Sequence, residues 1–316
     1  MEYQMHGLPF APAALNGMSE ALISSHHQNN YGGAVKRLNA IRTKLAAHSP
    51  SSLAGFELNG LKREELIATN SMLLHELYFG NLGGAGAAMV PAMALALSAN
   101  FGSVERWREE FVAMGKALGG GSGWVLLVFQ PRDGSLVNQW AADHTHALAG
   151  GIPILALDMY EHAYAMDFGA AAARYVDAFM DNILWSAVYE RYQHAVHGAS
   201  DAFGATPAEA TGAVFLDVRR DAVYQAAPTQ IEGAQWHDPA KVSDWAPTLP
   251  KDQAYVVCCI YGHEVGRSTA MHMRAAGLNA RYLSGGIDGW QAAGLPVQTK
   301  ATATVTTYWR GALSRP

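Results

Sequence analysis

The segment from Leu157 to Tyr164 contains the residues best suited to chemistry. Asp158 and His162 are four residues apart, so on a helix both side chains would leave one face and could bind the same ion. A carboxylate oxygen beside an imidazole nitrogen suits iron, manganese or zinc. Two more histidines, His26 and His75, lie upstream in segments with a helical pattern. Three imidazoles and one carboxylate would leave a position open for solvent or a small substrate.

Four short motifs follow one another in an order typical of one protein family. They are Leu8-Pro9-Phe10, Phe101-Gly102-Ser103, Gly121-Ser122-Gly123-Trp124, and the set Asp158, Glu161, His162, Ala163 and Tyr164. Over about its first two thirds the chain therefore resembles the iron/manganese superoxide dismutase family. The resemblance implies one iron or manganese ion per subunit, held by His26, His75, Asp158 and His162. It also implies superoxide as the substrate, converted to oxygen and hydrogen peroxide by cycling of the metal between two oxidation states.

The resemblance assigns further roles around the metal. Members of the family orient metal-bound solvent with a glutamine or, in some iron-using members, with a histidine of a later strand. His144 falls at that later position, which favours iron slightly over manganese. Glu161 and Tyr164 belong in the family to the contact between subunits, so we expect a homodimer or a higher homo-oligomer. Tyr160 replaces the tryptophan that the family has between the aspartate and the glutamate of the motif.

The substrate gate of the family is not kept. Members usually carry a histidine and a tyrosine four and eight residues after the first ligand, and ungapped alignment places Asn30 and Ala34 there. Tyr31 could supply a substitute phenol, but a residue five positions after His26 lies off its face on a regular helix. His27 is an alternative to His26 as the ligand.

The last third of the chain has an α/β pattern. Apolar segments at residues 213–219, 255–259 and 281–286 predict strands, and a helix is expected at residues 268–276. Their order, followed by residues 290–297, resembles a rhodanese domain. The resemblance implies that a Cys259 thiolate attacks a sulfane-sulfur donor and becomes a persulfide. Cys258, inside an apolar strand, is expected to be a small core residue.

The loop after Cys259 departs from the rhodanese pattern. Gly262 stands at the family spacing, but Glu264 replaces the arginine that follows two residues later. Arg267 lies further along and could substitute for it, and His263 could assist deprotonation of the thiol. An acidic residue in this loop would oppose anionic donors such as thiosulfate.

We therefore expect a multidomain protein: an N-terminal α-helical hairpin plus an α/β part with the iron/manganese superoxide dismutase fold, then a C-terminal α/β rhodanese-like domain. A hairpin is predicted from residues 12–48 with its turn at residues 31–33, and one closing helix from 170–197. Asp217 and Arg219 are expected to form an ion pair that braces a loop. The predicted limits are 1–198 for the first domain (hairpin about 1–85, α/β part about 90–198), 199–206 for a small-residue linker, 207–300 for the second domain and 301–316 for a tail.

The composition limits the partners, the cellular location and the disulfides that we expect. The chain has 316 residues, half of them hydrophobic, and a net charge of −5, which gives no reason to expect nucleic acid as a partner. No apolar run reaches the length that crosses a membrane, and the N-terminus lacks the pattern of a signal peptide, so we expect no membrane partner and a cytoplasmic location. The two cysteines are neighbours, so no disulfide framework is expected.

The leading hypothesis is a superoxide dismutase fused to a rhodanese-like sulfurtransferase. A second is a sulfurtransferase whose N-terminal domain is a catalytically weak, metal-binding dimerisation domain. A third is a non-enzymatic metal-binding or redox-sensing protein.

Overall fold

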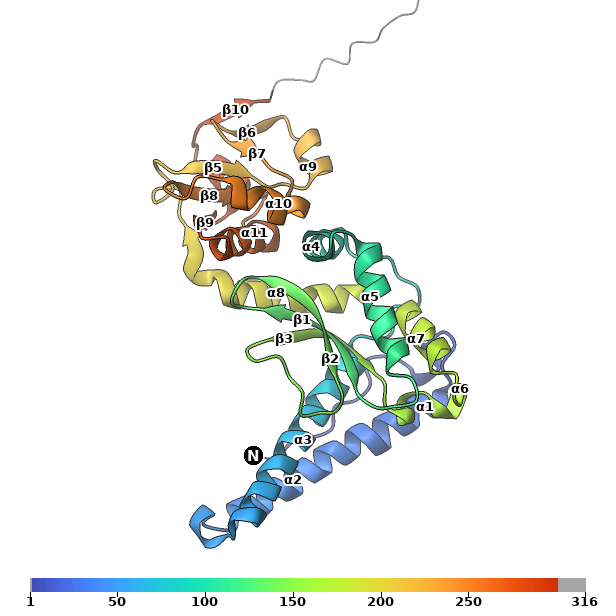
Figure 1. The fold of residues 1–316 in the computed structure, drawn as a ribbon. Coiled ribbons are helices and arrows are strands. Elements are labelled where there is room, and N and C mark those ends of the chain that lie inside the picture. The colour runs from blue at the N-terminus through green and yellow to red at the C-terminus, as the bar shows by residue number, and fades with distance from the viewer. Residues whose placement is uncertain (1, 301–316) are drawn as a thin grey trace, which may run out of the picture.

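The structure is a computed structural model that describes residues 2–300 (Figure 1). Its N-terminal part consists of helices. In chain order these are η1 (Pro12–Ala14), α1 (Glu20–Ser25), the π-helical η2 (His26–Tyr31), α2 (Gly32–Ala46), η3 (Pro50–Ser52) and α3 (Gly55–Gly80).

The predicted hairpin turn at residues 31–33 is wrong. The segments α1, η2 and α2 follow one another without a break from Glu20 to Ala46, and α2 then packs against α3 to form the hairpin (Figure 1). The residues up to Tyr31 form a π-helical segment, in which hydrogen bonds join residues five apart, and the helix therefore continues through them. The real turn lies between Ala46 and Gly55, where Pro50 and three serines end regular helix.

The middle of the chain builds a three-stranded antiparallel sheet in the order β2-β1-β3. The central strand β1 is buried from Trp124 to Phe129 and pairs along its length with the following strand, β2. The predicted single helix from 170 to 197 is divided, because the chain leaves helical geometry where Ile183 pairs with Leu82. The elements here are α4 (Pro91–Phe101), α5 (Val104–Ala117), β1 (Trp124–Gln130), β2 (Ser135–Ala141), β3 (Ile152–Asp158), η4 (Glu161–Ala163), α6 (Ala165–Phe168), α7 (Ala172–Asp181) and α8 (Trp185–Ser200).

Two of the motifs found in the sequence contain residues that fix where helices and strands begin or end. Gly102 ends α4 with a φ of 87°, and the Ser103 side chain caps α5 by accepting from the Arg106 N–H. Gly123, with a φ of 134°, precedes β1, and a Cβ at this position would lie 2.1 Å from the carbonyl oxygen of Ala141. Glycine is therefore required where β1 begins.

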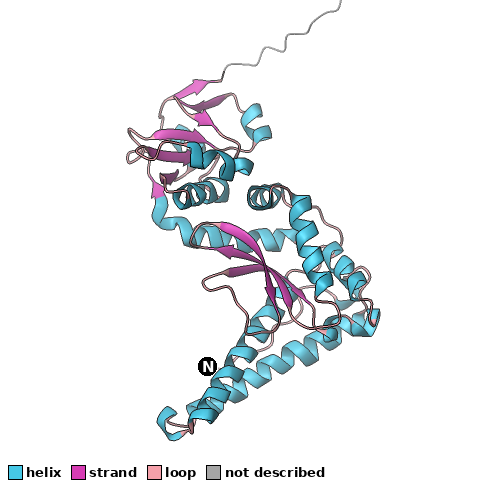
Figure 2. Cartoon of the chain, viewed as in Figure 1, coloured by secondary structure: helices cyan, strands magenta, loops and turns pink. Residues whose placement is uncertain are grey.

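The C-terminal part is a five-stranded parallel sheet in the order β4-β9-β8-β5-β7, with a separate antiparallel pair β10-β6 (Figure 2). The predicted α/β character is confirmed. The elements are η5 (Asp201–Phe203), β4 (Gly204–Ala205), β5 (Val214–Asp217), α9 (Asp221–Ala226), β6 (Thr229–Ile231), β7 (Gln235–Trp236), η6 (Pro239–Lys241), α10 (Val242–Trp245), η7 (Ala246–Thr248), β8 (Ala254–Cys258), α11 (Glu264–Ala275), β9 (Asn279–Leu283), α12 (Gly286–Ala292) and β10 (Val297–Thr299).

The segment expected to be a small-residue linker is largely helix and strand. Helix α8 continues to Ser200, η5 follows at once, and Gly204 and Ala205 pair with β9 as an edge strand of the C-terminal sheet. Helix α8 packs against β3 on one side and α11 on the other, so it joins the two parts (Figure 1). A Cβ at Gly204 would lie 2.9 Å from the Tyr282 hydroxyl, so this glycine allows the edge strand to lie close to β9. The expected tail, 301–316, lies outside the described residues.

None of the helices within residues 2–300 combines the length and the apolar character needed to cross a membrane.

Candidate metal centre and cysteine pocket

Four side chains from four separate segments meet inside the N-terminal part. His26 begins η2, His75 lies in α3, Asp158 ends β3 and His162 lies in η4. Their ligand atoms all lie within 4.8 Å of one another. One oxygen, Oδ2 of Asp158, is 3.2 Å from Nε2 of His26, 3.2 Å from Nε2 of His162 and 3.5 Å from Nε2 of His75. The four residues singled out in the sequence therefore share one site.

The helix assumed for Asp158 and His162 is absent. Strand β3 extends to Asp158, because its pairing with β1 continues to the Trp124–Asp158 pair. The chain then turns, with the Tyr160 N–H donating to Oδ1 of Asp158 at 2.8 Å, before η4 begins. The two side chains converge through this turn, not through the period of a helix.

The protonation states of the His75 and His26 rings are those that metal ligands require. Nδ1 of His75 donates to the carbonyl oxygen of Ser71 at 2.6 Å, which leaves a lone pair on Nε2 facing the cluster. That Nε2 atom is buried and has no hydrogen-bond partner among residues 2–300. Burial lowers the pKa of His75 to about 3 and also lowers the pKa of His26, so both rings are neutral.

The carboxylate completes the donor set. Burial alone would raise the pKa of Asp158, but the neighbouring imidazoles, His162 first, hold it well below its usual range. An ionised carboxylate and the neutral imidazoles of His26 and His75 are ligands that suit a first-row metal ion. The residues present therefore fit iron or manganese.

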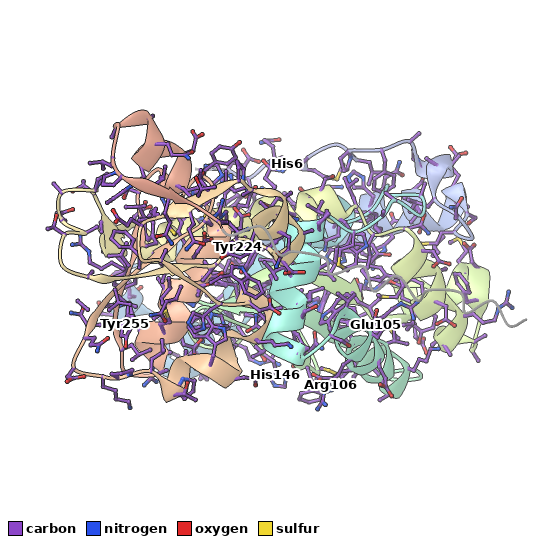
Figure 3. The ribbon with its side chains drawn as sticks, turned by 90° about the horizontal axis from the view of Figure 1, so that it is seen from above. His6, Glu105, Arg106, His146, Tyr224 and Tyr255 are labelled. Carbon is purple, nitrogen blue, oxygen red and sulfur yellow. The ribbon has the colours of Figure 1, made fainter. Side chains whose placement is uncertain are left out.

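His144 lies beside the cluster with a fixed ring. Its Nδ1 accepts from Nε1 of Trp124 at 3.0 Å, which places the ring proton on Nε2, and the Asn70 side chain donates to its carbonyl oxygen. Tyr160 is stacked between this ring and the ring of His162, at centroid distances of 4.8 and 5.3 Å. Burial lowers the pKa of His144. His146, in contrast, is exposed at the edge of the molecule seen from above (Figure 3).

The π-helical segment brings Tyr31 toward the site. On a regular α-helix, Tyr31 would lie off the face of His26. Instead the Tyr31 ring lies 6.5 Å from that of His75, and its hydroxyl donates to Oε1 of Glu76 at 2.9 Å and accepts from the His6 N–H. His27 points elsewhere, with Nε2 2.9 Å from the carbonyl oxygen of His6, so His26 is the histidine of this pair that belongs to the cluster.

Glu161 and Tyr164 differ in their surroundings. Glu161 is exposed, as is Met166 nearby, at 59% of its surface. Tyr164 is buried and stacked on Tyr175 within the same chain, at 5.4 Å between centroids.

The second site surrounds Cys259, directly after β8. The thiol lies in a cavity of about 200 Å³. Burial raises its pKa, while backbone N–H groups of Gly266, Gly262 and His263 act in the opposite direction. Gly262 has a φ of 71°, and a Cβ there would lie 2.5 Å from the carbonyl oxygen of Leu283. The glycine is required by this close approach of two loops.

Arg267 is engaged outside the cavity. Its guanidinium contacts Asp201 at 2.5 Å, Ser200 at 3.2 Å and the carbonyl oxygen of Gly262 at 3.0 Å, and it stacks 4.2 Å above the Tyr282 ring. The ring of His263 lies 6.0 Å from that of His197, and the His263 backbone carbonyl lies 4.0 Å from Sγ of Cys259. Cys258 is buried at the end of β8, as expected of a core residue.

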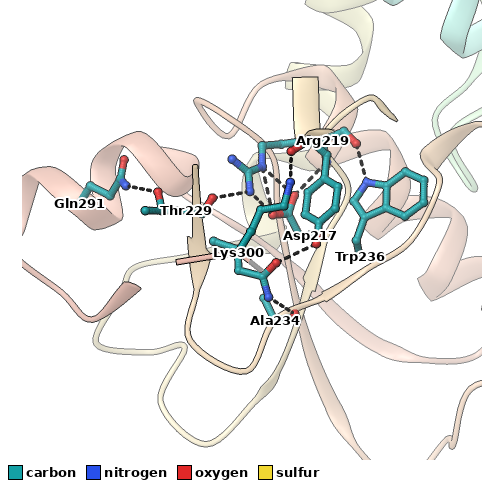
Figure 4. A network of polar contacts seen from close by, with 9 residues as sticks. Asp217, Arg219, Thr229, Ala234, Trp236, Gln291 and Lys300 are labelled. Carbon is teal, nitrogen blue, oxygen red and sulfur yellow. Dashed lines mark hydrogen bonds and ion pairs between the residues drawn. The ribbon is translucent and has the colours of Figure 1, made fainter. Parts of the chain in front are cut away.

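The expected ion pair of Asp217 and Arg219 is confirmed (Figure 4). The arginine Nε contacts both carboxylate oxygens at 3.0 Å, and Nη2 also donates to the carbonyl oxygen of Thr229 at 2.9 Å. Trp236 donates to the arginine's own carbonyl at 2.9 Å. The pair thus braces the loops that follow β5.

Comparison with known proteins identifies a family for each of the two parts of the chain. The family model described as iron/manganese superoxide dismutases, C-terminal domain, matches residues 89–191, and that of the rhodanese-like domain matches residues 205–293. A protein of Cupriavidus metallidurans named superoxide dismutase [Fe] is 63% identical over 196 residues, which cover 62% of this chain and 99% of the relative.

More distant relatives carry either metal in their names. Superoxide dismutase [Mn] 2 of Haloferax volcanii is 34% identical over 199 residues, covering 62% of this chain and 98% of that protein. Superoxide dismutase [Fe] of Aquifex pyrophilus is 35% identical over 195 residues, which cover 58% of this chain and 89% of that protein. The chain therefore belongs to the iron/manganese superoxide dismutase family, extended at its C-terminus by a rhodanese-like domain.

Proposed function

We propose that His26, His75, Asp158 and His162 hold one iron ion and that the chain disproportionates superoxide to oxygen and hydrogen peroxide. When bound, the ion supplies the one-electron redox chemistry of both half-reactions. The observation that carries the assignment is the buried Nε2 of His75, which has no hydrogen-bond partner within residues 2–300 although its tautomer is fixed by Ser71. A buried lone pair without a partner costs free energy unless a ligand occupies it.

The surrounding residues have separate roles in this proposal. His144 carries its proton on Nε2 and orients solvent at the open position, which favours iron. Tyr160 holds the rings of His144 and His162 in place by stacking on both. Tyr31 and Glu76 stand in for the missing gate residues by linking the hairpin helices beside His75.

We propose the remaining features from the resemblance. Residues 1–198 and 207–300 form the two domains, and 199–206 connect them. Glu161 mediates assembly into a homodimer or higher homo-oligomer, supported by the exposed Glu161 and Met166 near His162, whereas Tyr164 is buried within its own chain. We place the protein in the cytoplasm.

Elemental analysis and superoxide consumption test the metal site together. Protein purified without added metal is expected to contain about one iron per chain, and His75→Gln and Asp158→Asn are expected to lose both the metal and the activity. His48→Gln, which changes an exposed histidine outside the cluster, is the matched control. Full metal content in both ligand variants would contradict the assignment.

Sulfur transfer at Cys259 is the second function. It is favoured by the backbone N–H groups that face the thiol at the bottom of a cavity. Cyanide-dependent thiocyanate formation should be lost in Cys259→Ser and kept in Cys258→Ser. Equal activity of the two variants would exclude Cys259 as the nucleophile.

A further inference from the structure

Both parts of the chain line the cavity around Cys259. The N-terminal part supplies Ala92 from α4 and Tyr189 from α8, and the C-terminal part supplies residues that include Arg220, Cys259 and Glu264. A molecule that reaches the thiol therefore contacts both parts.

Glu264 is held in this cavity by helix α8. The carboxylate accepts from the Tyr189 hydroxyl at 2.5 Å through Oε1 and from the Gln193 amide at 3.1 Å through Oε2. Gln193 also donates to the Tyr189 hydroxyl at 3.1 Å, so the three side chains form a closed set. Glu264 is only 6% exposed. Both partners donate, which matches an ionised, acceptor-only carboxylate.

No arginine within residues 2–300 forms an ion pair with Glu264. Arg267 is bound to Asp201, and Arg219 is bound to Asp217. Arg220 lines the cavity and is partly exposed, whereas Glu264 is buried beside the cysteine loop. A dianionic donor that approaches the Cys259 thiolate would therefore meet a second, fixed negative charge in a site of low dielectric constant.

We propose that this cavity between the two parts is a sulfur-transfer site in which Glu264, fixed by Tyr189 and Gln193, selects sulfane-sulfur donors that carry an ammonium group over dianionic thiosulfate. The proposal rests on the proposed sulfurtransferase activity of Cys259. A fitting donor is a small aminoalkyl hydropersulfide, whose ammonium group would pair with Glu264.

The transfer step balances without an external oxidant. The Cys259 thiolate attacks the terminal sulfur of R–S–S–H, the S–S bond of the donor breaks and a new S–S bond forms to Cys259. The leaving thiolate takes the proton of the terminal sulfur and departs as R–S–H, leaving the persulfide anion on Cys259. Cyanide then removes the outer sulfur as thiocyanate and restores the thiolate.

The test measures kcat/KM for Cys259-dependent thiocyanate formation with three donors. These are 2-aminoethyl hydropersulfide, its uncharged analogue 2-hydroxyethyl hydropersulfide, and thiosulfate, each corrected for the rate with Cys259→Ser. Glu264→Gln is expected to shift the ratio of aminoethyl donor to thiosulfate toward thiosulfate by about tenfold, equal to about 1.4 kcal/mol. Tyr189→Phe should shift it in the same direction, and the exposed Glu190→Gln on the same helix should leave it unchanged. A ratio unchanged in Glu264→Gln would overturn the proposal.

A second measurement does not depend on turnover. In a Cys258→Ser background, the alkylation rates of Cys259 by iodoacetamide and by anionic iodoacetate are compared. Glu264→Gln and Tyr189→Phe should raise the relative rate of iodoacetate. If this ratio changes while no donor yields thiocyanate, the sulfurtransferase function fails although the charge selection by Glu264 stands. An unchanged ratio in both variants overturns the selection itself.

Discussion

The metal-free protein should lose stability between about pH 7 and pH 5. Burial lowers the pKa of His75 from its usual 6.5 to about 3, so the folded protein keeps this ring neutral in a range where the unfolded chain protonates it. A depressed histidine pKa means that the unfolded state binds more protons. The contribution of the neutral His75 ring to the free energy of unfolding is fully present above pH 6.5 and is lost as the pH falls toward 3. The pKa of His26 is lowered in the same direction.

The size of the effect follows from linkage. Each pH unit below the unfolded pKa costs about 1.36 kcal/mol per group, so His75 alone should cost about 2 kcal/mol at pH 5. Asp158 stays ionised in this window, because its pKa is held well below the usual range. The contribution of His75 is therefore separable by replacing it with a side chain that does not titrate.

Urea unfolding of chelator-treated protein at the two pH values is the assay. His75→Gln should lose about 2 kcal/mol less than the wild type on going from pH 7 to pH 5. The exposed His48→Gln should follow the wild type. An equally steep loss in His75→Gln and wild type would refute the assignment of a neutral, buried ring at this position.

Three further predictions concern the surroundings of the site. Tyr31→Phe removes a buried hydroxyl with two hydrogen bonds and should lower the free energy of unfolding by about 1–3 kcal/mol in urea titrations, with metal content unchanged. Gly123→Ala places a methyl group against the carbonyl oxygen of Ala141 and should cost about 1–3 kcal/mol or more, whereas Gly60→Ala, in an open helical position, should stabilise by about 0.5–1 kcal/mol; equal melting temperatures would contradict both. His144→Ala should lower superoxide turnover while iron analysis still finds the metal, and loss of the metal would instead make this residue structural.

The types of the metal-binding residues could be predicted from the sequence, because only a few kinds of side chain bind a redox metal. Few combinations of side chains bind a redox metal, and the order of the motifs located His75 and Asp158 without coordinates. The glycines were readable for a similar reason, since positions such as Gly123 exclude any side chain. Strands β5, β8 and β9 followed from the apolar segments at residues 213–219, 255–259 and 281–286, whereas the short strands β4 and β7 were not predicted.

The secondary structure of the chain around the metal site could not be predicted from the sequence. The helix expected for Asp158 and His162 is a strand end and a turn, because pairing with β1 outweighs the helical pattern. At residues 31–33, where the hairpin turn was expected, the π-helical η2 passes directly into α2. Both outcomes depend on contacts with residues distant in sequence, which override local preference.

The sequence by itself determined which atoms could bind a metal and that Cys259 directly follows an apolar strand, because side-chain chemistry belongs to each residue alone. Only the tertiary structure decided the charge around that cysteine, since Arg267 is bound by Asp201 and Glu264 is fixed by Tyr189 across the junction of the two parts. Such partners are set by how helices α8 and α11 pack, and no local pattern of residues encodes that packing.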